Sequence, residues 1–341
     1  MTRASIQRFI RQNPFLFTLL LLIIAVLVNR ALQENLLQLT VLNRNLRAML
    51  PTMILVVGQT LVIISGGIDL SLGTMMLMIN ALLVRWITSD STTGEIVLAM
   101  AMSVGVGALA GAFNGFCVAI LRLQPIVTTY ATGFVFAGIA LEVLPRPGGD
   151  IPRDWSLFYG SPQRFLFLEW PFAAYIIVLL ILFWLILKAT RYGQYLFATG
   201  GNAQAAYTTG VPVSTIRLSA YMWAGIFAGF AAIARTLLTG SANASLALRD
   251  GGTLTLLTIT AVVLGGTRLS GGQGSVIGSI IGVALLTFIG NIISFANVPT
   301  WYQDLVNATI IVLALAGPGI FRLVRSGVLA LVARRRVKAI A

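Results

Sequence analysis

The sequence predicts an all-α, polytopic membrane protein of about ten transmembrane helices (8–10), with both termini in the cytoplasm. Of its 341 residues, 57% are hydrophobic and only 10% are charged, and the mean hydropathy is +0.92. A soluble domain is about one quarter charged, so this chain cannot cover itself with a water-compatible surface. Long apolar runs recur along its whole length, which predicts a single transmembrane domain over residues 1–341.

Ten segments approach the apolar length that crossing a bilayer requires, about 20 residues. We place them near residues 14–29, 48–65, 70–87, 96–120, 126–144, 170–187, 217–239, 253–266, 275–294 and 303–322. No small-residue cleavage site follows the first, so we expect a retained span rather than a removed signal peptide. The 253–266 segment is short and rich in threonine, which favours a half-helix or a re-entrant element.

The connections between spans differ in character. Residues 31–47 are mixed in polarity and suit an interfacial helix or an outer loop. Residues 145–169 form the longest outer segment, and their proline and glycine clusters indicate turns. Two series of small residues at four-residue spacing predict close helix packing, with a dimer seam or substrate path as the alternative. They are Gly107, Gly111, Gly115 and Ala119, and Gly274, Gly278 and Gly282.

The net charge of +13 is distributed unevenly between the two predicted sides. The predicted cytoplasmic parts are almost purely basic, with Asp69 as their only acid, whereas the outer parts hold both signs. The basic tail, residues 323–341, is therefore predicted to be cytoplasmic and to face anionic lipid or to act as an orientation signal. No aromatic and basic platform accompanies the charge, which argues against nucleic-acid binding. Cys117 is alone in the sequence, so no intrachain disulfide is possible.

A polar segment, residues 188–217, lies between two apolar runs and contains a short predicted helix. Asn202 is suited to cap its start, because its side-chain oxygen can accept a hydrogen bond from a free backbone N–H. Gly210 supplies a left-handed stop, and Pro212 prevents continuation. A short capped helix between two spans indicates a contact with something outside the membrane, the alternative being an ordinary cytoplasmic connector.

A second polar break follows the 48–65 span. Gly66 and Gly67 end that helix, and Asp69 is predicted to cap the next one from Leu70, with Ser71 as a second acceptor. A direct role of Asp69 in coupling is the alternative. An echo occurs later in the chain: VIISGGIDLS at 62–71 is followed by VVLGGTRLS at 262–270, with Gly265 and Gly266 as its glycine pair. Both turns are predicted to face inward, and the match indicates either an internal repeat or chance.

Three stretches carry a family resemblance that covers residues from about 50 to 320. GGIDLSLG at 66–73 resembles the GGIDLSVG signature of sugar-type ABC transporter permeases, the ribose, xylose and galactose importer subunits of bacteria. RYGQYLFATGGNAQAAYTTG at 191–210 resembles the loop R-x-G-x-x-x-x-A-x-G-G-N-x-x-A-A-x-x-x-G of that family. AVVLGGTRLSGGQG at 261–274 is similar to its AVVLGGTSLFGGxG segment.

The resemblance implies a permease domain that imports a monosaccharide-like solute across the bacterial inner membrane by alternating access. It implies three kinds of partner: a cytoplasmic ABC ATPase, a periplasmic sugar-binding protein, and a second permease in a homodimer or heterodimer. It makes residues 188–217 a cytoplasmic coupling loop, with the matching positions Gly200, Gly201, Asn202, Ala205, Ala206 and Gly210. Which sugar or related solute is imported stays open at this stage.

One departure from the family pattern stands out. The family usually has Glu-Leu-Asp-Ala-Ile-Ala before the AVVLGG segment, where this chain has TLLTIT at 255–260. Thr255 and Leu257 therefore stand where both carboxylates are expected. The loss indicates either a different substrate or a partner permease that supplies the acid.

Few polar side chains remain to line a substrate path. The candidates are the amides Asn80, Asn114, Asn291 and Asn307, together with Arg235. A neutral sugar needs hydrogen-bond donors and acceptors, and amides offer both. The alternative is that the amides join helices to one another and that Arg235 extends to the membrane surface.

Other function classes have little support in the sequence. No G-x-x-x-x-G-K-[ST] pattern occurs, so the chain is not expected to hydrolyse ATP itself. Histidine is absent and cysteine single, which leaves little for a catalytic, metal or cofactor site. An ion-coupled secondary transporter of a small polar solute is the alternative reading, although Glu142 is the only glutamate well within a span.

Overall fold

The computed structural model describes residues 15–165 and 168–296, and the single residues 299, 302, 305, 306, 308, 309 and 312. The chain divides into two compact units, residues 1–292 and 293–341. Most of the second unit lies outside the described residues, including Asn307, the tail 323–341 and all but separate positions of the predicted 303–322 span. The architecture below is that of the first unit.

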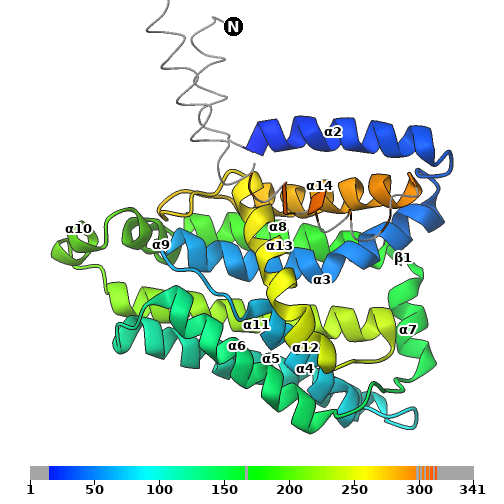
Figure 1. Cartoon of the computed structure of the whole chain (residues 1–341), viewed down its shortest axis with the longest axis horizontal. Coiled ribbons are helices and arrows are strands. Elements are labelled where there is room, and N and C mark those ends of the chain that lie inside the picture. Colours follow the sequence, from blue (N-terminus) through cyan, green and yellow to red (C-terminus); the bar gives the residue numbers. More distant parts are fainter. Residues whose placement is uncertain are drawn as a thin grey trace, which may run out of the picture. The chain divides into compact units, whose positions relative to one another are not determined.

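Helices make up almost all of the described part of the first unit (Figure 1). They are α2 (Phe15–Leu32), α3 (Leu39–Ile64), α4 (Leu72–Trp86), α5 (Thr93–Gly115) with a π-helical turn η1 (Phe116–Ile120), α6 (Pro125–Val143), α7 (Arg153–Gly160), α8 (Phe172–Ala189), α9 (Arg191–Gly201), α10 (Ala203–Thr208), α11 (Val213–Thr239), α12 (Ser245–Arg249), α13 (Gly251–Leu264) and α14 (Val276–Phe295). An antiparallel hairpin, β1 (Pro162–Phe165) and β2 (Leu168–Pro171), is the one sheet among the described residues.

Seven of the described helices are long and apolar enough to cross a membrane: α2, α3, α5 with η1, α6, α8, α11 and α14. The apolar helices α4 and α13 are shorter, with 15 and 14 residues. The all-α polytopic class predicted from the sequence is confirmed. Nine of the ten predicted spans correspond to one of these helices, with ends that agree within a few residues except at the start of α3, which begins at Leu39 rather than near residue 48. The tenth is the 303–322 segment named above.

Two connections that the sequence predicts to lie on the outer side are more ordered than it indicates. Residues 39–47 belong to α3 rather than to a separate interfacial helix or loop. Asn43 explains the extension, because its side-chain amide donates a 2.6 Å hydrogen bond to the carbonyl of Gly160 at the end of α7. The Tyr159 hydroxyl donates to the Arg47 carbonyl. The predicted turn-rich 145–169 segment thus contains α7 and most of the hairpin, and α7 contacts the part of α3 that continues beyond the apolar run.

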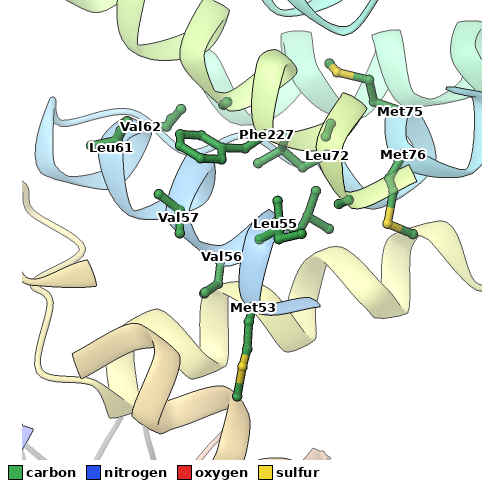
Figure 2. Close-up of a cluster of buried hydrophobic side chains, with 14 of the residues drawn as sticks. Met53, Leu55, Val56, Val57, Leu61, Val62, Leu72, Met75, Met76 and Phe227 are labelled. Carbon is green, nitrogen blue, oxygen red and sulfur yellow. The ribbon is translucent and has the colours of Figure 1, made fainter. Parts of the chain in front are cut away.

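The core of the unit is built around α3. Nearly every side chain of α3 from Met53 onward is buried, including polar ones, whereas α5, α6 and α8 carry many exposed large apolar side chains. Figure 2 shows side chains of α3, α4 and α11 meeting in one cluster, among them Leu55, Leu72 and Phe227. Buried α3 is thus surrounded by helices whose outward faces suit lipid.

Glycines bring α5 and α11 into backbone contact. A methyl group at Gly107 would overlap the carbonyl of Gly225, and one at Gly111 would overlap the carbonyl of Tyr221. The reverse also holds, since a methyl at Gly225 would overlap the Gly107 carbonyl. The predicted packing role of this small-residue series is confirmed, and the contact partner is α11. In the second series, Gly278 and Gly282 pack in the same way on the backbones of Gly265 and Ala261.

Replacing Gly107 tests this packing. We expect Gly107→Ala to destabilise the protein by about 1–3 kcal/mol, because α5 must move away from α11 to admit the methyl group. Thermal unfolding of the purified protein in detergent measures the effect. Gly105→Ala, on the same helix and with no described atom within 4 Å of the new methyl, is the matched control. Equal unfolding temperatures for the two variants would contradict the contact.

Candidate functional site

The polar 188–217 segment folds as two consecutive helices, α9 and α10, at the end of the bundle opposite α7 (Figure 1). The start of α10 is capped as predicted: the Asn202 side-chain oxygen accepts a 3.0 Å hydrogen bond from the Ala205 backbone N–H. Its end is also as predicted, since Gly210 has a φ of +86° and the Val211 N–H bonds back to the Ala206 carbonyl. Helix α9 was not expected from the sequence.

The two faces of α10 differ in exposure. Ala206 is only 5% exposed and packs toward the rest of the chain, so its small size serves contacts within the protein. Ala205 and Tyr207 lie on the exposed face, and the Tyr207 side chain is 70% exposed. A large aromatic side chain is therefore exposed to solvent on α10, the helix that projects furthest at this end of the bundle (Figure 1).

Helix α9 is held firmly on its inner side. The Tyr192 hydroxyl lies 2.9 Å from the Ser219 hydroxyl on α11, and the Thr190 side chain caps the helix by accepting from the Gly193 N–H. Burial raises the pKa of the Tyr192 phenol, against a smaller lowering by the hydrogen bond to Ser219, so the group stays protonated at neutral pH. Thus α10 projects from a base that is fixed to the membrane bundle.

The two echoed glycine turns have the same backbone structure. After α3, the N–H groups of Ser65, Gly66 and Gly67 bond to the carbonyls of residues 61, 63 and 62. After α13, the N–H groups of residues 265, 266 and 267 bond to the carbonyls of 261, 263 and 262. The left-handed residues are Gly66 and Gly266, with φ of +85° and +86°. The equivalence is therefore an offset of 200 residues, which pairs Gly67 with Thr267, rather than the pairing of Gly66–Gly67 with Gly265–Gly266.

Three segments that are far apart in the sequence meet at these turns, in what we call the glycine junction: residues 64–66, 200–201 and 271–272. The Gly272 N–H donates a 2.9 Å hydrogen bond to the Ile64 carbonyl. A methyl group at Gly200 would overlap that same carbonyl and lie 2.6 Å from the Gly272 nitrogen. One at Gly271 would lie 2.8 Å from the Gly200 carbonyl oxygen and 2.9 Å from the Gly66 Cα. The contacts are therefore between backbones.

Asp69 lies fully buried in the turn after Gly66–Gly67. One carboxylate oxygen accepts from the Ser71 backbone N–H at 2.8 Å and from its hydroxyl at 2.6 Å, and the other accepts from the Asn114 amide at 3.3 Å. The prediction that Asp69 caps a helix beginning at Leu70 is wrong. The Leu70 N–H donates instead to the Thr129 hydroxyl, and α4 begins at Leu72. Asp69 and Asn114 together attach this turn to α5.

Thr255 takes a structural role where the family pattern has a carboxylate. Its hydroxyl, fully buried on α13, accepts a 2.9 Å hydrogen bond from the Gly73 N–H and donates to the Gly251 carbonyl. Gly73 lies in the first turn of α4, whose N–H groups have no partner within the helix. The threonine therefore provides a neutral connection between α13 and α4. Leu257 is partly exposed on another face of α13.

The predicted path residues are not gathered in one place. The Asn80 amide donates a 2.7 Å hydrogen bond to the Thr236 hydroxyl, which connects α4 to α11. The Asn114 amide donates to the Ser71 hydroxyl in the turn that contains Asp69. Arg235 is half-buried near the C-terminal end of α11 and interacts electrostatically with Asp250. Asn291 is half-buried on α14, with no hydrogen bond from its side chain to another described residue.

Sequence reasoning missed Gln59, in the middle of α3. Its side chain is fully buried, and neither the amide nitrogen nor the amide oxygen has a hydrogen-bond partner among the described residues. Such a group costs about 1–3 kcal/mol relative to a satisfied one. A glutamine within an otherwise apolar run of a span was the available signal. Gly271 and Gly272 were also missed, although their Gly-Gly pair is visible in the sequence.

Comparison with known proteins places the chain in a family. Residues 41–315 match the family model described as branched-chain amino acid transport system / permease component. The ribose import permease protein RbsC of Bacillus subtilis is 32% identical over 307 residues, which cover 89% of this chain and 91% of that protein. The galactofuranose transporter permease protein YtfT of Escherichia coli is 31% identical, over 78% of this chain and 75% of that protein.

The autoinducer 2 import system permease protein LsrD of Photorhabdus temperata is 30% identical, covering 76% of this chain and 78% of that protein. No solved structure matches the chain. The resemblance drawn from the three sequence motifs is confirmed by these relatives. The chain belongs to the family of permease subunits of bacterial ABC importers, which are multi-pass proteins of the inner membrane.

Proposed function

We propose that this chain is the transmembrane permease subunit of an ABC importer that carries a monosaccharide-like solute across the inner membrane. Alternating access is driven by separate ATPase subunits, and the chain has no ATPase activity of its own. The observation that carries the proposal is α10, a capped helix that projects from a base fixed to α11 and to the glycine junction. Similarity to the ribose and galactofuranose permeases supports the choice of a sugar.

The partners follow from this function. A cytoplasmic ABC ATPase binds the coupling loop, residues 188–217, and a periplasmic sugar-binding protein delivers the solute at the other side. The permease works as a homodimer or as a heterodimer with a second permease, within membrane lipid. Both termini are cytoplasmic in this arrangement, and the tail 323–341 is a basic anchor at the inner surface.

The exposed face of α10 is the surface that the ATPase contacts. A short helix seated in a groove of the partner transmits displacement as a rigid body. Tyr207 is the anchor on this face, because large aromatic side chains contribute most to binding when a partner buries them. Gly200, Gly201, Asn202 and Gly210 fix the position and length of the helix beneath it.

Gln59 is the best-placed polar contact for the solute. Its amide offers a donor and an acceptor, the pair that a sugar hydroxyl uses, and its helix is the buried centre of the bundle. Arg235 and Asn291 are further candidates, whereas the amides of Asn80 and Asn114 already hydrogen-bond within the protein.

Reconstituted transport tests the function. We expect proteoliposomes that contain this chain, its ATPase and its binding protein to take up a labelled sugar only when ATP is supplied. A panel of ribose, galactose and leucine separates the sugar class from the branched-chain amino acids of the family description. Uptake driven by an ion gradient without the ATPase would instead establish a secondary transporter and overturn the proposal.

Replacing Tyr207 tests whether the ATPase contacts the exposed face of α10. We expect Tyr207→Asp to reduce ATP-driven uptake at least tenfold, since loss of a buried aromatic anchor costs about 2 kcal/mol or more. Co-purification of the ATPase should fall in parallel. The unfolding temperature of the permease alone should not change, because the side chain is 70% exposed. Tyr195→Asp, at a less exposed position on α9, is the control, and equal losses for both would argue against a specific anchor.

Replacing Gln59 tests whether its side-chain amide contacts the solute. We expect Gln59→Leu to raise the unfolding temperature, because removing an unsatisfied buried amide gains about 1–3 kcal/mol. Uptake should fall in the same variant through a higher KM for the sugar. Asn80→Leu, which breaks a satisfied amide contact with Thr236, should have the opposite effect on stability. A stabilised Gln59→Leu variant with unchanged uptake would remove Gln59 from the path.

A further inference from the structure

The glycine junction has a property that ordinary side-chain packing lacks. Its contacts connect the backbones of three segments, so no rotamer change can relax them. The Gly272 N–H is bonded to the Ile64 carbonyl, and Gly200 fits between those two residues with no room for a methyl group. Gly272 itself has no space for a Cβ, which would lie 2.5 Å from the Gly201 Cα. Movement of residues 200–201 toward the other two segments must therefore displace them.

Those neighbours are the end of α3 and the loop that follows α13. Residues 64–66 contain the last residue of α3 and the first two residues of its glycine turn. Residues 271–272 lie later in the loop that begins with the matching glycine turn after α13. Helix α3 is the buried centre of the bundle, and α13 bonds to the first turn of α4 through Thr255. The junction therefore connects the base of α10 to the end of α3, the most buried of the long helices, and to the loop that follows α13.

We propose that the glycine junction is the transmission point of the importer: it makes the base of α10, the end of α3 and the loop after α13 move as one body. Gly200 is the positioning residue at its centre. The proposal rests on the function proposed above and adds the route by which a displacement of α10 reaches the core. Opening and closing then occur elsewhere in the bundle, and the junction keeps one geometry throughout the transport cycle.

The first test separates transmission from docking. In proteoliposomes that hold the complete transporter, transport by Gly200→Ala is measured as sugar taken up per ATP hydrolysed, so that any change in the amount of bound ATPase cancels. Sugar taken up per ATP hydrolysed should fall about tenfold, within the range of ordinary coupling free energies. Gly252→Ala, on α13 with no described atom within 4 Å of the new methyl, should keep the wild-type ratio. Equal ratios for the two variants would overturn the proposal.

The second test does not depend on how well Gly200→Ala folds. Spin labels are placed at Gln204 on α10 and Ser270 in the turn after α13, both exposed, in a Cys117→Ser background of the otherwise wild-type transporter. We expect the same inter-label distance in the nucleotide-free and ATP-bound states. A shift as large as one helical turn, about 5.4 Å, would show that the segments separate and would refute the single body.

The two proposals fail in different ways. If the wild-type transporter shows no ATP-driven uptake at all, the proposed function is wrong. If the wild type takes up sugar but the label distance changes between states, only the junction proposal is wrong.

Discussion

Contact between the backbones of different segments is the constraint on which this structure depends. Within a bilayer, lipid tails are as apolar as leucine side chains, so helices associate through close van der Waals packing and hydrogen bonds rather than through the hydrophobic effect. Glycine permits the closest approach, and it does so along the interface of α5 with α11 and again where residues 64–66, 200–201 and 271–272 meet. The outer faces are left free to carry bulky apolar side chains.

Features that depend on local sequence could be predicted well. Apart from the start of α3, the apolar runs predicted the helix ends to within a few residues, because crossing lipid requires a minimum number of apolar positions. The ends of α10 were predictable residue by residue, since Asn202 and Gly210 act on backbone groups only a few positions away. The order in residues 39–47 was not, because it depends on α7, which is more than 100 residues further along the chain.

The candidate site was predictable in part for the same reason. Its motifs could be found in the sequence, but not which glycine contacts which, since that is decided by segments distant in the chain. Asp69 is an example: a carboxylate before a helix predicts a cap, yet Thr129 on α6 already satisfies the Leu70 N–H. Gln59 shows the reverse, because a glutamine in an apolar run gives no sign of whether it will find a partner.

The matching glycine turns after α3 and α13 determine how the sequences of the two halves of the chain should be aligned with each other. In the first turn, the Tyr221 hydroxyl occupies the space beside Gly67. In the second, the side chain of Thr267 lies against Gly274 and accepts a hydrogen bond from the Ser275 N–H. The two turns follow the same main-chain path, but different side chains fill the space beside it. An internal alignment should therefore be anchored on Gly66 and Gly266, the left-handed glycines of the two turns, because aligning the Gly-Gly pairs would superpose the halves one position out of step.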